Sequence, residues 1–286
     1  MRQRWLADGA LLLAAMVWGS TFVVQRLVGQ DQGSVFWFNA ARFALGAGLL
    51  SVGIGFRFPA ERAFWRWAGL AGTLLFLGSA LQQAGLRYTT AGNAGFLTSL
   101  YLPLVPLLLA LFWRERPSGL TLAGVGLAVM GAYLLSLNGP YQARRGDLLV
   151  VLSAFFWSWH VILLSKRAAA FPTLAFAAAQ FWTNALWQAG LGLVFEPWSV
   201  MRSSVFWVAV LYAAVFSVGL GFTLQVWGQQ RTPATDAALI LSLEAAFAAL
   251  FGAWFLHERL SPGQTLGAGL IFAGVVLAQL RGPTKG

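Results

Sequence analysis

The chain has 286 residues, of which 58% are hydrophobic and only 10% are charged. A soluble domain carries about 25% charged residues, so a globule of this composition could not cover its surface with polar side chains. The composition therefore predicts a membrane protein. The absence of cysteine excludes disulfides and thiol chemistry. The basic residues behind the net charge of +10 stand singly between apolar runs, so nucleic-acid binding is not expected.

Apolar runs recur along the whole chain and are separated by short breaks that carry glycine, proline or serine. The first run lasts about 18 residues, which is too long for the core of a cleaved signal peptide and long enough to span a bilayer. Because the runs are continuous rather than alternating, we expect helices and not barrel strands. The predicted spans, in chain order, are 8–29, 34–56, 65–88, 92–113, 118–136, 147–167, 172–195, 204–228, 235–256 and 262–280.

The basic residues of the loops predict the orientation of these spans. With the N-terminus inside, twelve arginines and lysines fall on the inner side and five on the outer side; Arg26 and Arg42, at the outer ends of spans, complete the total of 19. The bias favours both termini in the cytoplasm. We therefore expect a multi-pass protein of the inner (cytoplasmic) membrane.

The second part of the chain repeats the first. A shift of 143 residues pairs, without a gap, Gln82 with Gln225, Ser99 with Ser242, Glu115 with Glu258, Gly124 with Gly267, and Gly131 with Gly274. Nearer the front, a shift of 139 pairs Asp8 with Asp147 and Trp18 with Trp157. Each half holds five spans, an odd number, so the second half enters the membrane upside down. We predict two inverted five-helix repeats, 1–140 and 141–286, around a central cavity, as is typical of transporters. An old duplication in a receptor or scaffold is the alternative.

Two tryptophans and one arginine inside the spans are candidates for the cavity. Trp18 and Trp157 lie deeper than the interfaces where tryptophan usually collects, so they suit an aromatic wall, with ordinary packing as the alternative. Arg42 in the second span is a candidate for a substrate carboxylate, because guanidinium matches that group with two hydrogen bonds. Snorkelling of Arg42 toward the outer surface is the alternative.

Amides and hydroxyls inside the third and seventh spans need partners, because lipid supplies none. Ser79 and Gln82 are candidates for a hydrogen-bonding cavity wall. Gln180, Asn184 and Gln188 recur every four residues, which places them on one helix face. The alternative for all five is a tie between neighbouring helices.

The fourth and sixth spans add further candidates. Pro103 and Pro106 remove main-chain hydrogen bonds and should bend the fourth span, which suits either a gating helix or a static kink. Tyr101 is a polar group of the same span. His160, the one histidine within a predicted span, titrates near neutral pH, so transport would depend on pH if it lines the cavity. A satisfied core histidine is the alternative.

Glu244 opens a run of about a dozen residues that has no other charge. It stands nine residues into the ninth span, which is about 14 Å deep at 1.5 Å per residue. A charge at that depth costs several kcal/mol unless it faces protein or water. We therefore consider Glu244 a cavity carboxylate that contacts a substrate amino group or takes up a proton, with a tie between helices as the alternative. Its counterpart in the first half is Tyr101.

Small residues recur at helical spacing in the fifth and tenth spans, at Gly124, Ala128, Ala132, Gly263, Gly267 and Gly274. Such faces pack closely, and packing within the fold is favoured over dimerisation. A monomer and a homodimer through these two spans both remain open.

A membrane-embedded enzyme is not favoured. The chain has two histidines, no cysteine, no G-x-S-x-G sequence and no acid pair at helical spacing inside a span, so no catalytic or metal-binding set is predicted. No cofactor is expected. A GxxxxGK[ST] phosphate-binding loop is also absent, which points to secondary or facilitated transport.

Two sequence stretches resemble a known family. Trp18-Gly19-Ser20-Thr21-Phe22 resembles the signature of the drug/metabolite transporter superfamily in its ten-helix EamA type. That family's most recognisable stretch is similar to Leu243 through Phe247 with Gly252 and Glu258-Arg259-Leu260. Glu115-Arg116 is the equivalent sequence in the first half. The second tryptophan stretch, Trp157-Ser158-Trp159-His160, departs from the Gly-rich version that many members show.

The resemblance covers nearly the whole chain and implies a cavity walled by helices one to four and six to nine, with helices five and ten behind. It also implies a small-molecule substrate. The amino-acid exporters, including those of aromatic amino acids, are the nearest subgroup. We expect export of amino acids and related metabolites by alternating access. A multidrug or cationic-compound exporter of the same superfamily is the alternative, followed by a receptor or an enzyme.

Overall fold

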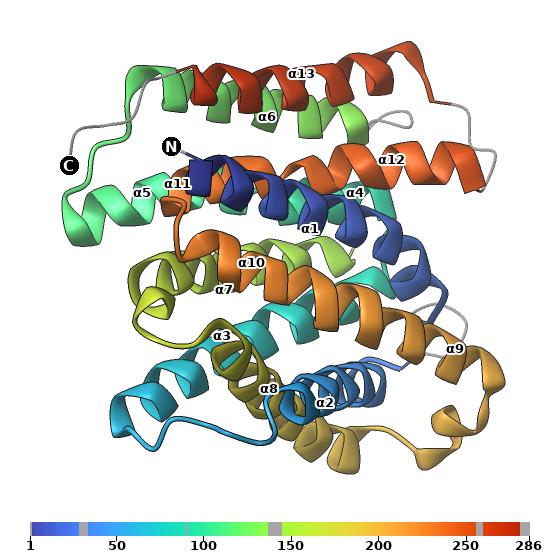
Figure 1. Cartoon of the computed structure of the whole chain (residues 1–286). Helices are drawn as coiled ribbons and strands as arrows, with labels where there is room; N and C mark the ends of the chain where they lie inside the picture. The colour runs from blue at the N-terminus through green and yellow to red at the C-terminus, as the bar shows by residue number, and fades with distance from the viewer. Residues whose placement is uncertain (1, 29–33, 90, 137–144, 256–259, 281–286) are drawn as a thin grey trace.

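The computed structural model describes residues 2–28, 34–89, 91–136, 145–255 and 260–280, and every regular element within these ranges is a helix (Figure 1). Helices are expected, because an apolar run in lipid must satisfy its main-chain hydrogen bonds within itself. The α-helices are α1 Arg2–Leu27, α2 Phe36–Gly53, α3 Arg62–Leu86, α4 Ala91–Thr98, α5 Tyr101–Trp113, α6 Gly119–Ser136, α7 Arg145–Arg167, α8 Thr173–Phe195, α9 Ser204–Tyr212, α10 Thr223–Gln229, α11 Ala234–Leu241, α12 Leu243–Phe255 and α13 Pro262–Gln279. Ala213–Phe222 is π-helical and joins α9 to α10.

The helices follow the predicted spans, with ends that differ by a few residues. Three spans consist of more than one segment: α4 with α5, α9 with the π-helical segment and α10, and α11 with α12. Six described stretches are long and apolar enough to cross a bilayer: Gln3–Phe22, Ala94–Trp113, Gly119–Ser136, Arg145–Ala170, Ser204–Gln229 and Ala234–Phe251. The chain is thus an all-helical, multi-pass membrane protein of about ten helices, and the exact number of ten crossings stays a prediction.

The helices form a bundle with two peripheral pairs (Figure 1). α6 packs along α13 at one edge, and α2 packs along α8 at the opposite edge. α1, α3, α7, α10 and α12 lie between these pairs. Fully buried phenylalanines, Phe43, Phe176 and Phe181 among them, fill the contact between α2, α3 and α8. The interior helices are therefore the ones that can surround a cavity.

Glycine allows α6 and α13 to approach closely. A Cβ on Gly124 would stand 2.5 Å from the carbonyl oxygen of Gly274, and a Cβ on Gly267 would stand 2.5 Å from that of Gly131. Because no side chain fits there, the small-residue faces of the two helices are used within the fold. A homodimer through these helices stays a prediction.

Two of the interior spans break at equivalent positions. α4 and α5 are separated at Ser99 and Leu100, and α11 and α12 are separated at Ser242. Pro103 is the third residue of α5 and Pro106 lies inside it, so the first break falls just before the prolines. The sequence analysis did not predict the second break, which has no proline. There the Ser242 hydroxyl donates to the main-chain oxygen of Leu239 at 2.7 Å, a local bond that competes with helix geometry.

Contacts between the halves occur in matching pairs. The indole of Trp18 lies against Gly221, and the indole of Trp157 lies against Gly78. Gly221 and Gly78 are 143 residues apart, in the register of the sequence repeat. The two contacts are therefore equivalent, because each tryptophan packs against the same repeat position of the opposite half.

A second matching pair is polar. The Thr232 hydroxyl donates to Oδ1 of Asp8 at 2.9 Å, and the Thr89 hydroxyl donates to Oδ1 of Asp147 at 2.5 Å. The first bond joins α1 to the chain just before α11, and the second joins α7 to the chain just before α4. Glu258 and Arg259 of the family stretch lie outside the described residues, whereas Glu115 forms an ion pair with Lys166.

Candidate functional site

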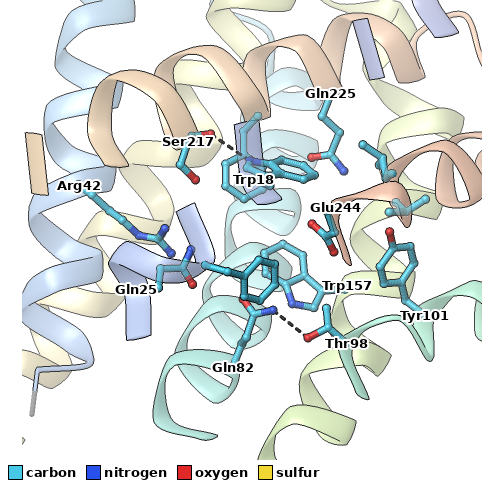
Figure 2. A pocket seen from close by; sticks show the side chains of 14 residues that line it. Trp18, Gln25, Arg42, Gln82, Thr98, Tyr101, Trp157, Ser217, Gln225 and Glu244 are labelled. Atoms are coloured by element: carbon cyan, nitrogen blue, oxygen red, sulfur yellow. Dashed lines mark hydrogen bonds between the residues drawn. The ribbon is translucent and has the colours of Figure 1, made fainter. Parts of the chain in front are cut away.

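A cavity lies between the interior helices and the inward side of α2 and contains about 540 Å³ of empty space, its open mouth included. Its wall includes six residues that the sequence analysis proposed: Trp18, Arg42, Gln82, Tyr101, Trp157 and Glu244 (Figure 2). They come from α1, α2, α3, α5, α7 and α12, so both halves of the chain contribute.

The two tryptophans form an aromatic wall together with Phe222. The Trp157 ring stacks on Phe222 with centroids 6.0 Å apart and an interplanar angle of 14°, and the Trp18 centroid lies 4.6 Å from that of Phe222. Trp18 Nε1 donates to the main-chain oxygen of Ser217 at 3.2 Å. Trp157 Nε1 is buried and has no hydrogen-bond partner among the described residues. The wall is thus apolar, with one unused donor.

Arg42 enters the cavity from α2 and is only 2% exposed. Its Nε donates to Oδ1 of Asn39 at 2.9 Å, whereas Nη1 is buried without a partner in the described chain. The guanidinium lies over the rings of Phe38 and Phe43, 5.2 and 4.9 Å from their centroids. The side chain faces the cavity and not the outer surface (Figure 2). A cation held this way, with donors to spare, suits an anionic ligand group.

The position of α2, and hence of Arg42, is fixed by a carboxylate at the end of α8. Glu196 Oε1 accepts hydrogen bonds from the main-chain nitrogens of Val35 at 2.6 Å and Phe36 at 3.1 Å, and Oε2 accepts from that of Trp37 at 3.0 Å. These are N–H groups that the first helical turn leaves free, so Glu196 caps α2 from another helix.

Glu244 lies on the side of the cavity opposite Arg42 (Figure 2). It belongs to the first turn of α12, directly after the break at Ser242, and is 8% exposed. Tyr101 begins α5 directly after the equivalent break. The two breaks therefore place equivalent polar side chains into one cavity. No salt bridge joins Glu244 to a basic group among the described residues, so its carboxyl group faces the cavity without a fixed counter-ion.

The other proposed cavity residues lie behind the wall and tie helices together. Ser79 Oγ accepts hydrogen bonds from Asn184 Nδ2 at 3.4 Å and Gln188 Nε2 at 3.1 Å, which links α3 to α8. His160 Nε2 and Gln180 Oε1 are 3.0 Å apart and link α7 to α8. All five side chains are buried. The geometry of these residues fits the alternative weighed above, ties between helices.

The cavity also contains polar residues that the sequence analysis did not propose. Gln25 follows Trp18 by seven residues, two helical turns along α1, so its place on the same face was readable from spacing. Thr98 accepts a hydrogen bond from Gln82 Nε2 at 2.9 Å. Ser217 contributes its main-chain oxygen from the π-helical segment, a feature that the sequence pattern does not reveal.

Groups that could hold a metal ion, with three or more histidine, aspartate or glutamate side chains together, are not found among the described residues. The arrangement offers instead a cation and a carboxyl group across an aromatic cavity. Such a site can bind and orient a solute.

A cavity built from both halves of a multi-pass helical bundle is the architecture of a membrane transporter. The chain belongs to the EamA-like transporter family, within the drug/metabolite transporter superfamily, and the family model matches residues 5–137 and again residues 144–280. Family membership and the names of its relatives indicate a transporter and not an enzyme.

Individual relatives agree with this assignment. The chain is 34% identical to an uncharacterized transporter of Archaeoglobus fulgidus, over 98% of this chain and 87% of that protein. It is 30% identical to the threonine/homoserine exporter RhtA of Escherichia coli, over 59% of this chain and 57% of that protein. One solved crystal structure matches with a TM-score of 0.80 and 21% identity and covers 96% of each chain, which shows a shared fold.

Proposed function

We propose that the protein exports amino acids, aromatic ones included, together with related small metabolites. The observation that carries this proposal is the placement of Arg42 and Glu244 on opposite sides of one cavity (Figure 2). A free amino acid carries a carboxylate and an ammonium group on one carbon. Arg42 has unused donors for the carboxylate, and Glu244 has acceptor oxygens for the ammonium.

The aromatic wall and one relative support the same substrate class. Trp18, Trp157 and Phe222 offer ring faces on which an aromatic or aliphatic side chain can pack. The partial relative in Escherichia coli is named an exporter of threonine and homoserine, two amino acids.

Transport proceeds, in this proposal, by alternating access of two inverted repeats, 1–140 and 141–286. The two matches to one family model and the exchanged contacts of Trp18 and Trp157 support the two-fold organisation. The bonds Asp8–Thr232 and Asp147–Thr89 are equivalent under that two-fold, so they are suited to close the cavity alternately from the two sides. Both termini lie in the cytoplasm, according to the distribution of loop arginines and lysines.

Export of cationic drugs is the second candidate, and Glu244 beside two tryptophans favours it, since aromatic faces and a carboxylate bind cations. Arg42 opposes it, because a buried guanidinium repels a cation and lacks a ligand carboxylate to pair with. The two candidates therefore differ in what Arg42 contributes.

Purified protein in liposomes separates these functions. Labelled amino acids and labelled tetraphenylphosphonium are offered with and without a pH gradient, to the wild type and to Arg42→Gln. The proposal expects counterflow of amino acids that Arg42→Gln lowers by about tenfold or more, because a hydrogen bond to a charged group is lost. Transport of the phosphonium alone, retained or increased in Arg42→Gln, would replace the proposal with the drug-export function.

A further inference from the structure

Six cavity residues form two equivalent sets, related by the register of the sequence repeat. The first set is Gln82, Thr98 and Tyr101, and the second set is Gln225, Leu241 and Glu244. All six line the same cavity, so the sequence differences between the sets make an otherwise two-fold site asymmetric.

In the first set, the amide nitrogen of Gln82 has a hydrogen-bond partner within the set. Gln82 Nε2 donates to the hydroxyl of Thr98 at 2.9 Å (Figure 2). The residue equivalent to Thr98 in the second set is Leu241, which has no hydrogen-bonding atom in its side chain. Gln225 is only 2% exposed, and its Oε1 has no partner in the described chain. The second set therefore lacks the hydroxyl that Gln82 contacts, and it presents a buried amide oxygen without an intramolecular bond in the described chain.

Gln225 and Glu244 line the same part of the cavity. Leu241 and Glu244 are three residues apart and both line the cavity, so they share one side of the α11–α12 segment. Figure 2 shows Gln225 and Glu244 entering from α10 and α12 on the side of the cavity away from Arg42. This side presents two acceptor groups, a carboxyl group and an amide oxygen, and the nearby hydroxyl of Tyr101.

We propose that Gln225 and Glu244 together recognise a primary ammonium group, and that Gln225 makes the site selective against N-methylated amines. This inference rests on the proposed export of amino acids and deepens it. A primary ammonium group has three N–H donors, which can bind the carboxylate and the amide oxygen at once. A trimethylammonium group has no N–H donor. It would leave the oxygen of Gln225 buried and unpaired, and a site built for a hydrogen bond rejects such a ligand strongly.

The test compares the dissociation constants of free and trimethylated ligands. L-threonine, L-phenylalanine and their N,N,N-trimethyl derivatives are titrated into detergent-purified protein by calorimetry. We expect the wild type to prefer the free amines. Gln225→Leu should weaken binding of the free amine by about tenfold and change binding of the trimethyl form by less than about twofold. The matched control is Gln229→Leu, which removes an amide of the same helix that does not line the cavity and should keep the preference.

A second variant tests the same idea without removing the amide. Leu241→Thr places a hydroxyl at the position that Thr98 has beside Gln82, and this hydroxyl can donate to Oε1 of Gln225 in place of the ammonium group. The variant should therefore reduce the preference for the free amine even if Gln225→Leu does not fold. Full preference retained in both Gln225→Leu and Leu241→Thr would overturn the role of Gln225, as would equal binding of free and trimethylated ligands by the wild type. Absence of binding of either free amino acid to the wild type would instead count against amino-acid export itself.

Discussion

The indole Nε1 of Trp18 donates a hydrogen bond to the main-chain oxygen of Ser217, 3.2 Å away, and the equivalent indole of Trp157 makes no such bond. The difference arises from the helices they face. Ser217 belongs to the π-helical segment, whose turns are wider than those of an α-helix. Its counterpart, Leu74, belongs to α3, which is α-helical, so its oxygen is used within the helix. Trp18 is therefore anchored, whereas the N–H of Trp157 is available.

The first prediction compares Trp18→Phe with Trp157→Phe. Trp18→Phe should lower the stability of the protein by about 1 kcal/mol, because it leaves the Ser217 oxygen without its donor. Trp157→Phe breaks no bond within the described chain and should have a smaller effect. Thermal melting in detergent measures the difference. A lower melting temperature for Trp157→Phe than for Trp18→Phe would contradict it.

Intrinsic fluorescence provides a second readout for these tryptophans. Addition of L-phenylalanine should quench or shift part of the wild-type emission if both rings line the binding site. Each variant should lose part of that change. The Trp5→Phe variant is the control, since Trp5 is 69% exposed and lies outside the cavity. A titration that is the same in Trp18→Phe and in the wild type would reduce Trp18 to a packing residue.

The sequence predicted the helical fold because a helix is specified by residues that lie close together along the chain. Long apolar runs with glycine and proline between them define the spans, and the register of repeated Gln, Glu and Gly residues predicts which helices are equivalent. The break at Ser242 was missed because a serine hydroxyl that bonds back to a carbonyl is common inside straight helices as well. Only the packed structure shows that the chain bends there.

The next prediction concerns the contact between α6 and α13. Gly131→Val should destabilise the protein by about 1–3 kcal/mol, because a Cβ at Gly131 would lie 2.8 Å from the main-chain nitrogen of Ile271. Gly126→Val, on the same helix, is the matched control, since nothing lies within 4 Å of a Cβ at that position. Melting temperatures of both variants test this. Equal melting temperatures would mean that the helices do not approach as described.

Topology can be tested by single-cysteine labelling, because the chain has no cysteine of its own. Ser199 and Arg62 are both exposed and lie in different loops or helix ends. With both termini in the cytoplasm, Ser199→Cys should react with an impermeant maleimide in intact cells, and Arg62→Cys only after permeabilisation. Labelling of Arg62→Cys in intact cells, and of Ser199→Cys only after permeabilisation, would indicate the opposite orientation.

The cavity was predictable in part, for a physical reason. Depth in the membrane identified Glu244 and the two tryptophans, because charge and misplaced aromatic groups are costly or unusual there. Arg42 was identified by the match of a guanidinium group to a carboxylate. The depth of a residue in the membrane does not say toward which side of its helix the side chain points. Ser79 and Asn184 lie inside their spans, as Gln82 does, yet Asn184 Nδ2 donates to Ser79 Oγ and links α8 to α3. Polar ties and cavity walls have the same sequence signature, and only the packing separates them.

The last prediction concerns Glu244. The residue is 8% exposed and lines the cavity, and its carboxyl group has no salt-bridge partner among the described residues. Glu244→Gln keeps the shape and one acceptor oxygen, so it should fold and reach the membrane. It should lose affinity for the ammonium group by about tenfold, because a charge-assisted hydrogen bond becomes a neutral one. Transport that uses the carboxyl group as a proton carrier should also lose its pH dependence.

Glu244→Leu separates binding from structure. If Glu244 served as a tie between helices, this variant would lower stability, although only by about 0.6 kcal/mol, the average for such bonds in membranes. No such tie is found among the described residues, and replacing a buried carboxyl group by an apolar side chain removes a desolvation cost. We therefore expect the melting temperature of Glu244→Leu to equal or exceed that of the wild type, with transport abolished. Uptake at several pH values and thermal melting of both variants distinguish a substrate-binding role of Glu244 from a structural one. Wild-type uptake in Glu244→Gln together with a lowered melting temperature in Glu244→Leu would assign Glu244 a structural role and remove it from the substrate site.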